Sequence, residues 1–203
     1  RFLVIDKDGT LWSEKPFFFQ GFFSFDRLEE LVKDKPQLKQ QSPFKEYVGQ
    51  NYTVLEQLSE KDIMELILIT HTNITQIEFN NFVKEWAEYA KHPGTNKLFV
   101  DMVYQPMLEL IDFLKTNQFK NYIVSGGGVD FMRESLSSVY GIPPEQIIGS
   151  SIKYQFIDKF NAKESEIKYN NTSFILRKAQ LDSLNNDYVK PENILLHIGK
   201  VPI

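Results

Sequence analysis

The sequence contains no cysteine and only three histidines, and it carries no excess of basic residues. Without cysteine, disulfides, cysteine-ligated zinc and thiol catalysis are excluded, although the compartment stays open. A formal net charge of −4 gives no basic surface of the kind that binds nucleic acid. No apolar run approaches the roughly 20 residues that a membrane-spanning helix needs. The composition, with 42% hydrophobic and 25% charged residues, is that of a soluble globular protein.

The sequence also lacks a recognisable signal peptide and an initial methionine. Its first residue is Arg1, and residues 2–5 already form an apolar run typical of a core strand. We therefore expect that residues upstream of Arg1 have been removed.

The order of the predicted elements indicates an α/β fold with a doubly wound, mostly parallel sheet. An apolar strand ends at Asp6, and its composition suits burial on both faces. Helical patterns then fill residues 14–98, and the α/β alternation returns near Pro106. An insertion of this size between two strands predicts an all-helical cap and not a simple crossover. We expect a catalytic core of residues 1–13 and 99–203, with the cap at 14–98.

The clearest helix starts at Thr75, which forms a capping box with Glu78, while Ile74 and Phe79 suit a hydrophobic staple. Its expected buried face carries Ile77, Phe82, Val83, Trp86 and Tyr89. The other predicted helices cover residues 22–33, 61–72, 107–116, 129–140 and 191–198. The other predicted strands cover 121–124, 147–149, a possible hairpin from 152–156, and 201–203, with an exposed loop at 158–172.

Two aspartates follow the first predicted strand, in the segment Asp6-Lys7-Asp8-Gly9-Thr10. Sheets of this class bind ligands beyond the carboxyl ends of their strands. Two close carboxylates repel each other, so a cation or a proton must offset their charge. One carboxylate can attack phosphorus while the other transfers a proton, with magnesium to screen the charge. The alternative is an acidic turn, but the position directly after four apolar residues favours catalysis.

A serine and three glycines follow the second predicted strand of the core. The hydroxyl of Ser125 and the amide of Gly126 can hold a phosphate oxygen at a helix N-terminus, although glycines also serve tight turns. Arg133, about two helical turns later, suits a second anionic group of a substrate; the alternative is a salt bridge with Asp130 or Glu134. The spacing of His71 and His197 does not suggest metal ligands.

These segments resemble the haloacid dehalogenase (HAD) superfamily, in a bacterial branch of phosphoserine-phosphatase-like hydrolases. The likeness includes residues 6–16, 104–107, 125–133 and 197–203, and it covers nearly the whole chain except about 157–185. It implies a magnesium-dependent phosphomonoester hydrolase that forms an aspartyl-phosphate. The substrate would be a small phosphorylated metabolite over which the cap closes, in the cytoplasm or the periplasm of a bacterium.

The resemblance also implies a role for each candidate residue. Asp6 would be the nucleophile and Asp8 the general acid and base. Lys190, just before Pro191, would steady the nucleophile and the phosphate. Asp6 and the backbone carbonyl of Asp8 would bind Mg²⁺. Phosphate and substrate binding would fall to Gly9, Ser125, Gly126 and Arg133.

Two features depart from the family pattern. The residue between the aspartates is Lys7, where close relatives usually carry Asn. The fourth motif of the family, a pair of aspartates that completes the magnesium site, is expected within a dozen or so residues after Ile203. The sequence is therefore expected to be truncated before that motif, and without it we expect weak magnesium binding.

Three other functions stay open at the sequence level. A phosphotransferase or phosphomutase would share every motif and differ in the acceptor. A haloacid dehalogenase attacks carbon and needs neither magnesium nor the second aspartate, so Asp8 argues against it. A catalytically inactive binding protein could retain the fold without the fourth motif. The identity of the substrate and the oligomeric state also stay open.

Overall fold

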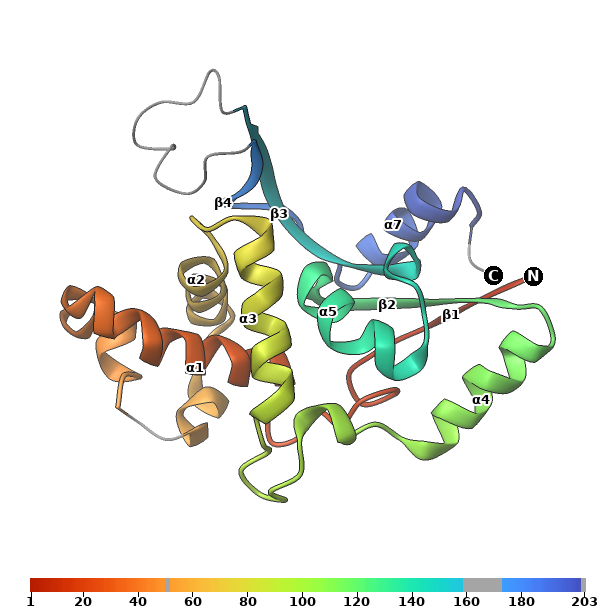
Figure 1. Cartoon of the computed structure of the whole chain (residues 1–203), viewed down its shortest axis with the longest axis horizontal. Coiled ribbons are helices and arrows are strands. Elements are labelled where there is room, and N and C mark those ends of the chain that lie inside the picture. Colours follow the sequence, from red (N-terminus) through yellow and green to blue (C-terminus); the bar gives the residue numbers. More distant parts are fainter. Residues whose placement is uncertain (50–51, 159–172, 202–203) are drawn as a thin grey trace. The chain divides into compact units, whose positions relative to one another are not determined.

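The computed structural model describes residues 1–49, 52–158 and 173–201 (Figure 1). Its sheet has the strand order β1-β2-β3-β4. The strands are β1 (Phe2–Ile5), β2 (Lys120–Gly128), β3 (Ile147–Ile157) and β4 (Phe174–Ser183). β1 pairs with β2 in parallel, and β2 pairs with β3 in parallel. The predicted α/β class with a mostly parallel sheet is therefore confirmed.

The helices follow the predicted order. They are α1 (Phe19–Asp34), α2 (Glu60–His71), α3 (Gln76–Tyr89), α4 (Gln105–Thr116), α5 (Val129–Tyr140) and α7 (Val189–Ile198). α5 has the predicted bounds, α2 is shifted by one residue, and α1, α4 and α7 start two or three residues earlier than predicted. Short 3₁₀ helices cover Pro36–Gln40, Phe44–Glu46, Tyr52–Gln57, Phe99–Asp101 and Pro144–Gln146. Within the described ranges, no helix combines the length and the apolar character needed to cross a membrane.

The helix ends follow from local chemistry. The amide of Thr75 donates to Glu78 Oε2 at 2.7 Å, and the amide of Glu78 donates to Thr75 Oγ1 at 3.1 Å, so the predicted capping box is confirmed. α5 and α7 end at Gly141 and Gly199, which adopt φ values of +55° and +72°. Glycine reaches this left-handed region without the steric cost that a side chain would add.

The buried face of α3 differs from the predicted one. Phe79, Val83 and Trp86 are buried, whereas Ile77 is 66% exposed and Tyr89 is 59% exposed. At 100° per residue, Phe79, Val83 and Trp86 form one stripe, and Ile77 lies on the opposite side of the helix. The predicted face was therefore wrong for Ile77 and Tyr89.

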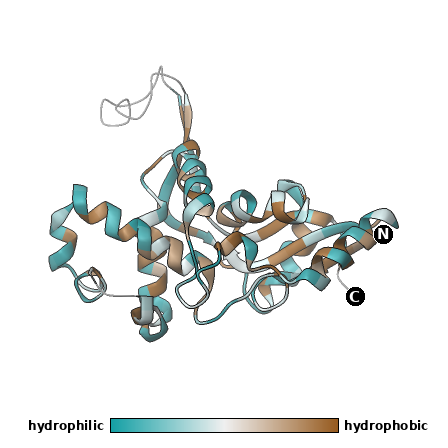
Figure 2. Cartoon of the chain, turned by 60° about the horizontal axis from the view of Figure 1, so that its bottom comes forward, coloured by the Kyte–Doolittle hydropathy of each residue, from teal (hydrophilic) through white to brown (hydrophobic). Residues whose placement is uncertain are grey.

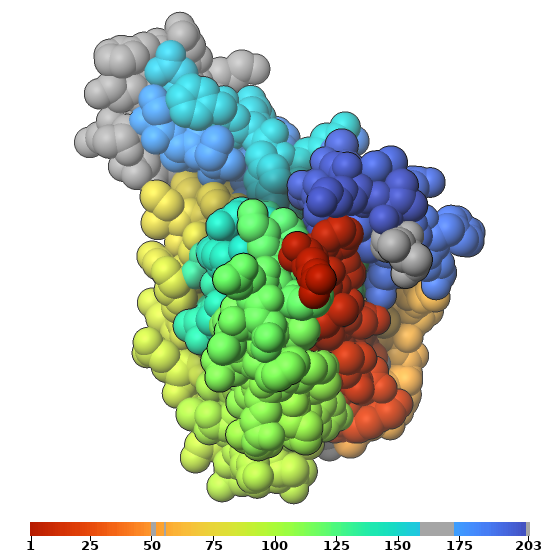
Figure 3. Space-filling model, turned by 90° about the vertical axis from the view of Figure 1, so that its right-hand side faces the viewer, coloured from red at the N-terminus to blue at the C-terminus, as the bar shows by residue number. Residues whose placement is uncertain are grey.

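β2 is the central strand of the part of the sheet that forms the core. α4, α5 and α7 all pack against it. Val124, Ile148 and Ile194 form a buried cluster from β2, β3 and α7, and Val4, Tyr122 and Ile198 pack around that cluster. Hydrophobic residues run along these strands in Figure 2. Figure 3 shows the first residues of the chain (red) at the surface between α4 (green) and α7 (blue).

The chain forms two compact units. The first unit contains Arg1–Phe18, Phe82–Ser151 and Asp182–Ile203, and the second contains Phe19–Asn81 and Ile152–Leu181. This division differs from the predicted core and cap in three places: residues 14–18 and 82–98 group with the core, and 152–181 group with the inserted helices. Tertiary pairing accounts for the two larger differences. Trp86 stacks on Phe99 within the first unit, and Leu176 forms a β-bridge with Thr75 within the second.

Two predicted segments have other outcomes. Residues 125–128 were expected to turn directly into a helix, but they remain in β2, with a register shift against β3 between Val124 and Gly128. The predicted loop at 158–172 lies outside the described residues apart from residue 158, as does most of the predicted strand at 201–203.

Candidate active site

The loop after β1 winds around one carbonyl group. The carbonyl oxygen of Lys7 accepts the amide hydrogens of Thr10, Leu11 and Trp12 at 3.1, 2.8 and 3.0 Å. Gly9 allows this tight path because its φ is +70°. A side chain at Gly9 would also begin 3.1 Å from the carboxylate of Glu14. The loop therefore holds Asp6 and Asp8 on a short, hydrogen-bonded frame.

Buried hydrogen bonds from Trp12 and Tyr140 hold the same loop in place. The indole of Trp12 donates to the carbonyl of Phe99 at 2.6 Å, and Trp12 is fully buried. The phenol of Tyr140 donates to the carbonyl of Leu11. Burial raises the pKa of Tyr140, so its hydroxyl stays protonated as a donor at physiological pH. The position of the aspartates is thus fixed by the core of the first unit.

Asp6 is held by two donors. Lys190 Nζ lies 2.9 Å from Asp6 Oδ2, and the amide of Lys7 donates to Asp6 Oδ1 at 2.8 Å. Lys190 stands in the first turn of α7, so it reaches Asp6 from the far end of the sequence. The Asp6 side chain is 48% exposed, which leaves it open to a ligand from solution.

Asp8 is held on both of its carboxylate oxygens. Lys7 Nζ lies 3.0 Å from Asp8 Oδ1. The hydroxyl of Ser125 lies 3.5 Å from Asp8 Oδ2 and accepts the amide hydrogen of Gly127 at 3.1 Å. The structure therefore brings Asp6, Asp8, Ser125 and Lys190 together at the carboxyl ends of β1 and β2.

Sequence reasoning missed a buried polar network that ties β2 to α7. Asn185 is fully buried, and its side-chain amide donates to the carbonyl of Ser125 at 2.8 Å. The backbone amide of Asn185 donates to Ser150 Oγ at 2.9 Å, and Asn193 donates to Asn185 Oδ1 at 2.9 Å. No motif signals these residues, because their partners are distant in sequence. The network links the Ser125 strand to the helix that carries Lys190.

Gly126 lies against the segment that precedes α7. A side chain at this position would begin 2.2 Å from Asn186 Oδ1, closer than any ordinary contact. A side chain at this position would therefore displace the exposed Asn186 side chain from its present place.

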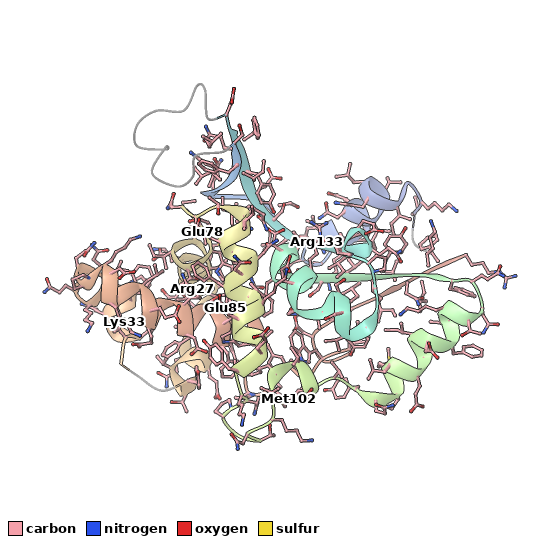
Figure 4. The ribbon with its side chains drawn as sticks, viewed as in Figure 1. Arg27, Lys33, Glu78, Glu85, Met102 and Arg133 are labelled. Atoms are coloured by element: carbon pink, nitrogen blue, oxygen red, sulfur yellow. The ribbon has the colours of Figure 1, made fainter. Side chains whose placement is uncertain are left out.

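Arg133 is engaged elsewhere. Figure 4 labels Arg133 on α5. Its Nε donates to the carbonyl of Pro144 at 3.0 Å, a terminal nitrogen donates to the carbonyl of Ile147 at 3.4 Å, and the other terminal nitrogen lies 3.9 Å from Asp130 Oδ1. Within the described residues, no recorded contact joins Arg133 to the two aspartates. Of the two interpretations left open by the sequence, the ion pair with Asp130 is present.

The site offers few ligands for a magnesium ion, but they are oxygen atoms, which magnesium prefers. Asp6 offers an exposed carboxylate, and the recorded hydrogen bonds of the described residues do not use the carbonyl of Asp8. The described part of the chain contains no group of three acidic or histidine side chains that could hold a metal ion. Magnesium commonly binds through one or two carboxylates, with water and phosphate oxygens, so the residues present fit a site of that type.

No protein-family model and no curated protein matches the chain. A phosphoserine phosphohydrolase-like protein from Francisella tularensis shares 19% identity over 90% of this chain and 64% of that chain, with a TM-score of 0.41. A protein of unknown function from Bordetella pertussis shares 10% identity over 98% of this chain and 72% of that chain, with a TM-score of 0.53. A HAD family hydrolase from Salmonella enterica serovar Typhi shares 11% identity over 97% of this chain and 50% of that chain, with a TM-score of 0.43.

The likeness is one of fold. This chain spans less than two thirds of the Francisella protein, 64% of its length. The Bordetella protein carries the fold comparison, because its TM-score of 0.53 extends over 98% of this chain.

Proposed function

We propose that this protein is a HAD-superfamily phosphatase that hydrolyses small phosphomonoesters with magnesium, through a covalent intermediate on Asp6. The observation that carries the proposal is the meeting of four polar side chains at the ends of two parallel strands. Lys190 pairs with Asp6 at 2.9 Å, and Ser125 lies 3.5 Å from Asp8. A nucleophile, an acid and base, a hydroxyl and a cation are the groups that phosphoryl transfer requires.

In the first step, an Asp6 carboxylate oxygen attacks phosphorus and the bond to the ester oxygen breaks. Asp8, in its protonated form, donates its proton to the departing alkoxide, which leaves as an alcohol. The product on the protein is an aspartyl-phosphate, a mixed anhydride. The exposed side of Asp6 admits the substrate, while its hydrogen bond from the amide of Lys7 fixes the carboxylate.

In the second step, water attacks the phosphorus of the intermediate. Asp8, now ionised, accepts a proton from that water, and the bond between phosphorus and the Asp6 oxygen breaks. Orthophosphate leaves and both aspartates return to their starting states. Lys190 and the hydroxyl of Ser125 offer donors to the phosphoryl oxygens in both steps.

Asp6 and the backbone carbonyl of Asp8 would hold magnesium, together with water and a phosphate oxygen. When bound, the ion would screen the negative charge that nucleophile and substrate bring together. Since few protein ligands are present among the described residues, we expect weak affinity.

The decisive experiment measures phosphate release from p-nitrophenyl phosphate with and without MgCl₂. Wild-type protein is compared with Asp6→Asn, and Asp112→Asn serves as the matched control because Asp112 is exposed on α4. We expect magnesium-dependent release in the wild type and the control, and none in Asp6→Asn, with equal melting temperatures. Release that persists in Asp6→Asn would overturn the assignment of the nucleophile.

A further inference from the structure

Lys7 is the residue of the site that the mechanism above leaves without a side-chain role. Its side chain is fully buried, and its Nζ lies 3.0 Å from Asp8 Oδ1. The same nitrogen faces the rings of Trp12 and Phe131, at 5.8 and 6.0 Å from their centroids. The contact with Asp8 is an ion pair without hydrogen-bond geometry, and among the described residues Nζ has no hydrogen-bond partner.

This placement is unfavourable for folding stability. An ammonium withdrawn from water loses its hydration, and a single ion pair with two ring faces compensates only in part. The structural work of Lys7 is done by its backbone, whose carbonyl accepts three amide hydrogens and whose amide donates to Asp6. An unbranched apolar side chain of similar length would leave those backbone bonds intact.

Within the described part of the chain, the buried ammonium forms an ion pair with one residue, Asp8. Lys7 contacts one oxygen of the Asp8 carboxylate and Ser125 contacts the other, so both oxygens of this carboxylate have a partner. Asp6 has its own cation, Lys190, at 2.9 Å. Each aspartate therefore has a separate lysine.

Resting on the function proposed above, we propose that Lys7 is a positioning residue that fixes the Asp8 carboxylate for proton transfer to the leaving group. It suits the site to alkyl phosphomonoesters, whose alkoxide cannot leave without a proton. An aryl phosphate such as p-nitrophenyl phosphate releases a stabilised anion and depends far less on that proton.

The test compares two substrates in Lys7→Met, which keeps an unbranched side chain, one atom shorter, and removes its charge. The measured quantity is kcat/KM for glycerol 3-phosphate and for p-nitrophenyl phosphate, because kcat/KM reports the steps up to departure of the leaving group. We expect a loss of about 100-fold for the alkyl substrate, the scale of general acid catalysis, and of less than about threefold for the aryl substrate.

Lys190→Met is the matched control. Lys190 pairs with the nucleophile, which every substrate uses, so both values should fall by the same factor and their ratio should not change. Asp8→Asn should change the ratio in the direction seen for Lys7→Met. The double variant should lose little more than Asp8→Asn alone, because both changes affect the same proton transfer.

Thermal melting gives a second readout that does not depend on turnover. Lys7→Met should melt at the same temperature as the wild type, because the Asp8 side chain is 28% exposed and is not left as a fully buried, unpaired charge. A lower melting temperature, or equal losses on both substrates, would overturn the role of Lys7 while leaving the phosphatase proposal in place. A wild-type protein that hydrolyses neither substrate with magnesium would overturn both.

Discussion

Two adjacent asparagines, Asn185 and Asn186, have opposite environments. Asn185 is fully buried and its side chain bonds Ser125 and Asn193, whereas Asn186 is exposed. Asn185→Ala would remove a hydrogen bond from the buried carbonyl of Ser125 and leave the side-chain amide of Asn193 with only its longer bond to Ser183 Oγ, at 3.3 Å. We expect it to lower the free energy of unfolding by about 3 kcal/mol. Activity should also fall at least about tenfold, since a shift of catalytic groups by an ångström has effects of that order or more.

Urea denaturation followed by circular dichroism measures the stability change. Asn186→Ala is the control at the next position, and it should stay within about 0.5 kcal/mol of the wild type because the side chain is exposed. Equal effects of the two substitutions would show that the network does not stabilise the fold.

Gly9 and Gly199 have similar backbone angles, with φ values of +70° and +72°. An alanine at either position costs about 1–2 kcal/mol because of the left-handed conformation. At Gly199 nothing lies within 4 Å of the added carbon, whereas at Gly9 the carboxylate of Glu14 lies at 3.1 Å. We expect both substitutions to lower stability and only Gly9→Ala to lower phosphate release, as a colorimetric phosphate assay would measure. Full activity in Gly9→Ala would contradict the inference that activity depends on the conformation of this loop.

At the scale of residues, the sequence predicts the groups of the site that stand in local motifs. Asp6 and Ser125 directly follow apolar runs, Asp8 stands two residues after Asp6, and Lys190 stands before Pro191 near the start of a predicted helix. Their roles remain predictions. The sequence could not predict Asn185, because its partners are up to 60 positions away. The burial of Lys7 was equally hidden, since a lysine in a loop is most often exposed.

At the scale of elements, α2 ends in a buried histidine, His71. Its ring nitrogens contact Gln20 at 3.2 Å and Thr70 at 2.8 Å, and Phe79 packs on the ring. Burial lowers the pKa of His71 well below 6.5, and the guanidinium groups of Arg177 and Arg27 lower it further. The folded protein therefore favours the neutral imidazole.

The sign of the pH dependence follows from this shift. The unfolded chain binds a proton near pH 6.5 and the folded chain does not, so this contribution to stability is complete above pH 6.5 and declines as the pH falls. The slope is at most about 1.4 kcal/mol per pH unit. We expect the melting temperature to fall between pH 6.5 and pH 5, and His71→Gln to remove part of that fall. His197→Gln, an exposed site, should leave the profile unchanged.

Elements with strong periodicity were predicted from sequence, and elements shaped by pairing were not. The capping box of α3 is local, so Thr75 and Glu78 mark its start in both sequence and structure. β4, at Phe174–Ser183, mixes charged and apolar residues without alternation and was not predicted. A short strand at 147–149 and the start of a hairpin at 152–156 were predicted separately, yet β3 is continuous over Ile147–Ile157.

At the scale of the whole molecule, the segments that make up each compact unit are set by contacts that no sequence pattern predicts. β3 and β4 each begin in one unit and end in the other. In the second unit, Arg177 of β4 lies over the ring of Phe79 at 3.7 Å and donates to the carbonyl of His71 at 2.7 Å. These contacts attach a strand segment to the inserted helices. The sequence alone predicted an insertion that is entirely helical.

The two units can be followed separately, because both tryptophans belong to the first. Trp12 stacks on Phe131 and Trp86 on Phe99, so tryptophan fluorescence reports the first unit, whereas His71 stands in the second. On acidification below pH 6.5, we expect the helical signal in circular dichroism to decrease before the fluorescence changes. Noncoincident transitions of this kind indicate unfolding that is not two-state. His71→Gln should bring the two transitions together, and coincident transitions in the wild type would show that the units unfold as one.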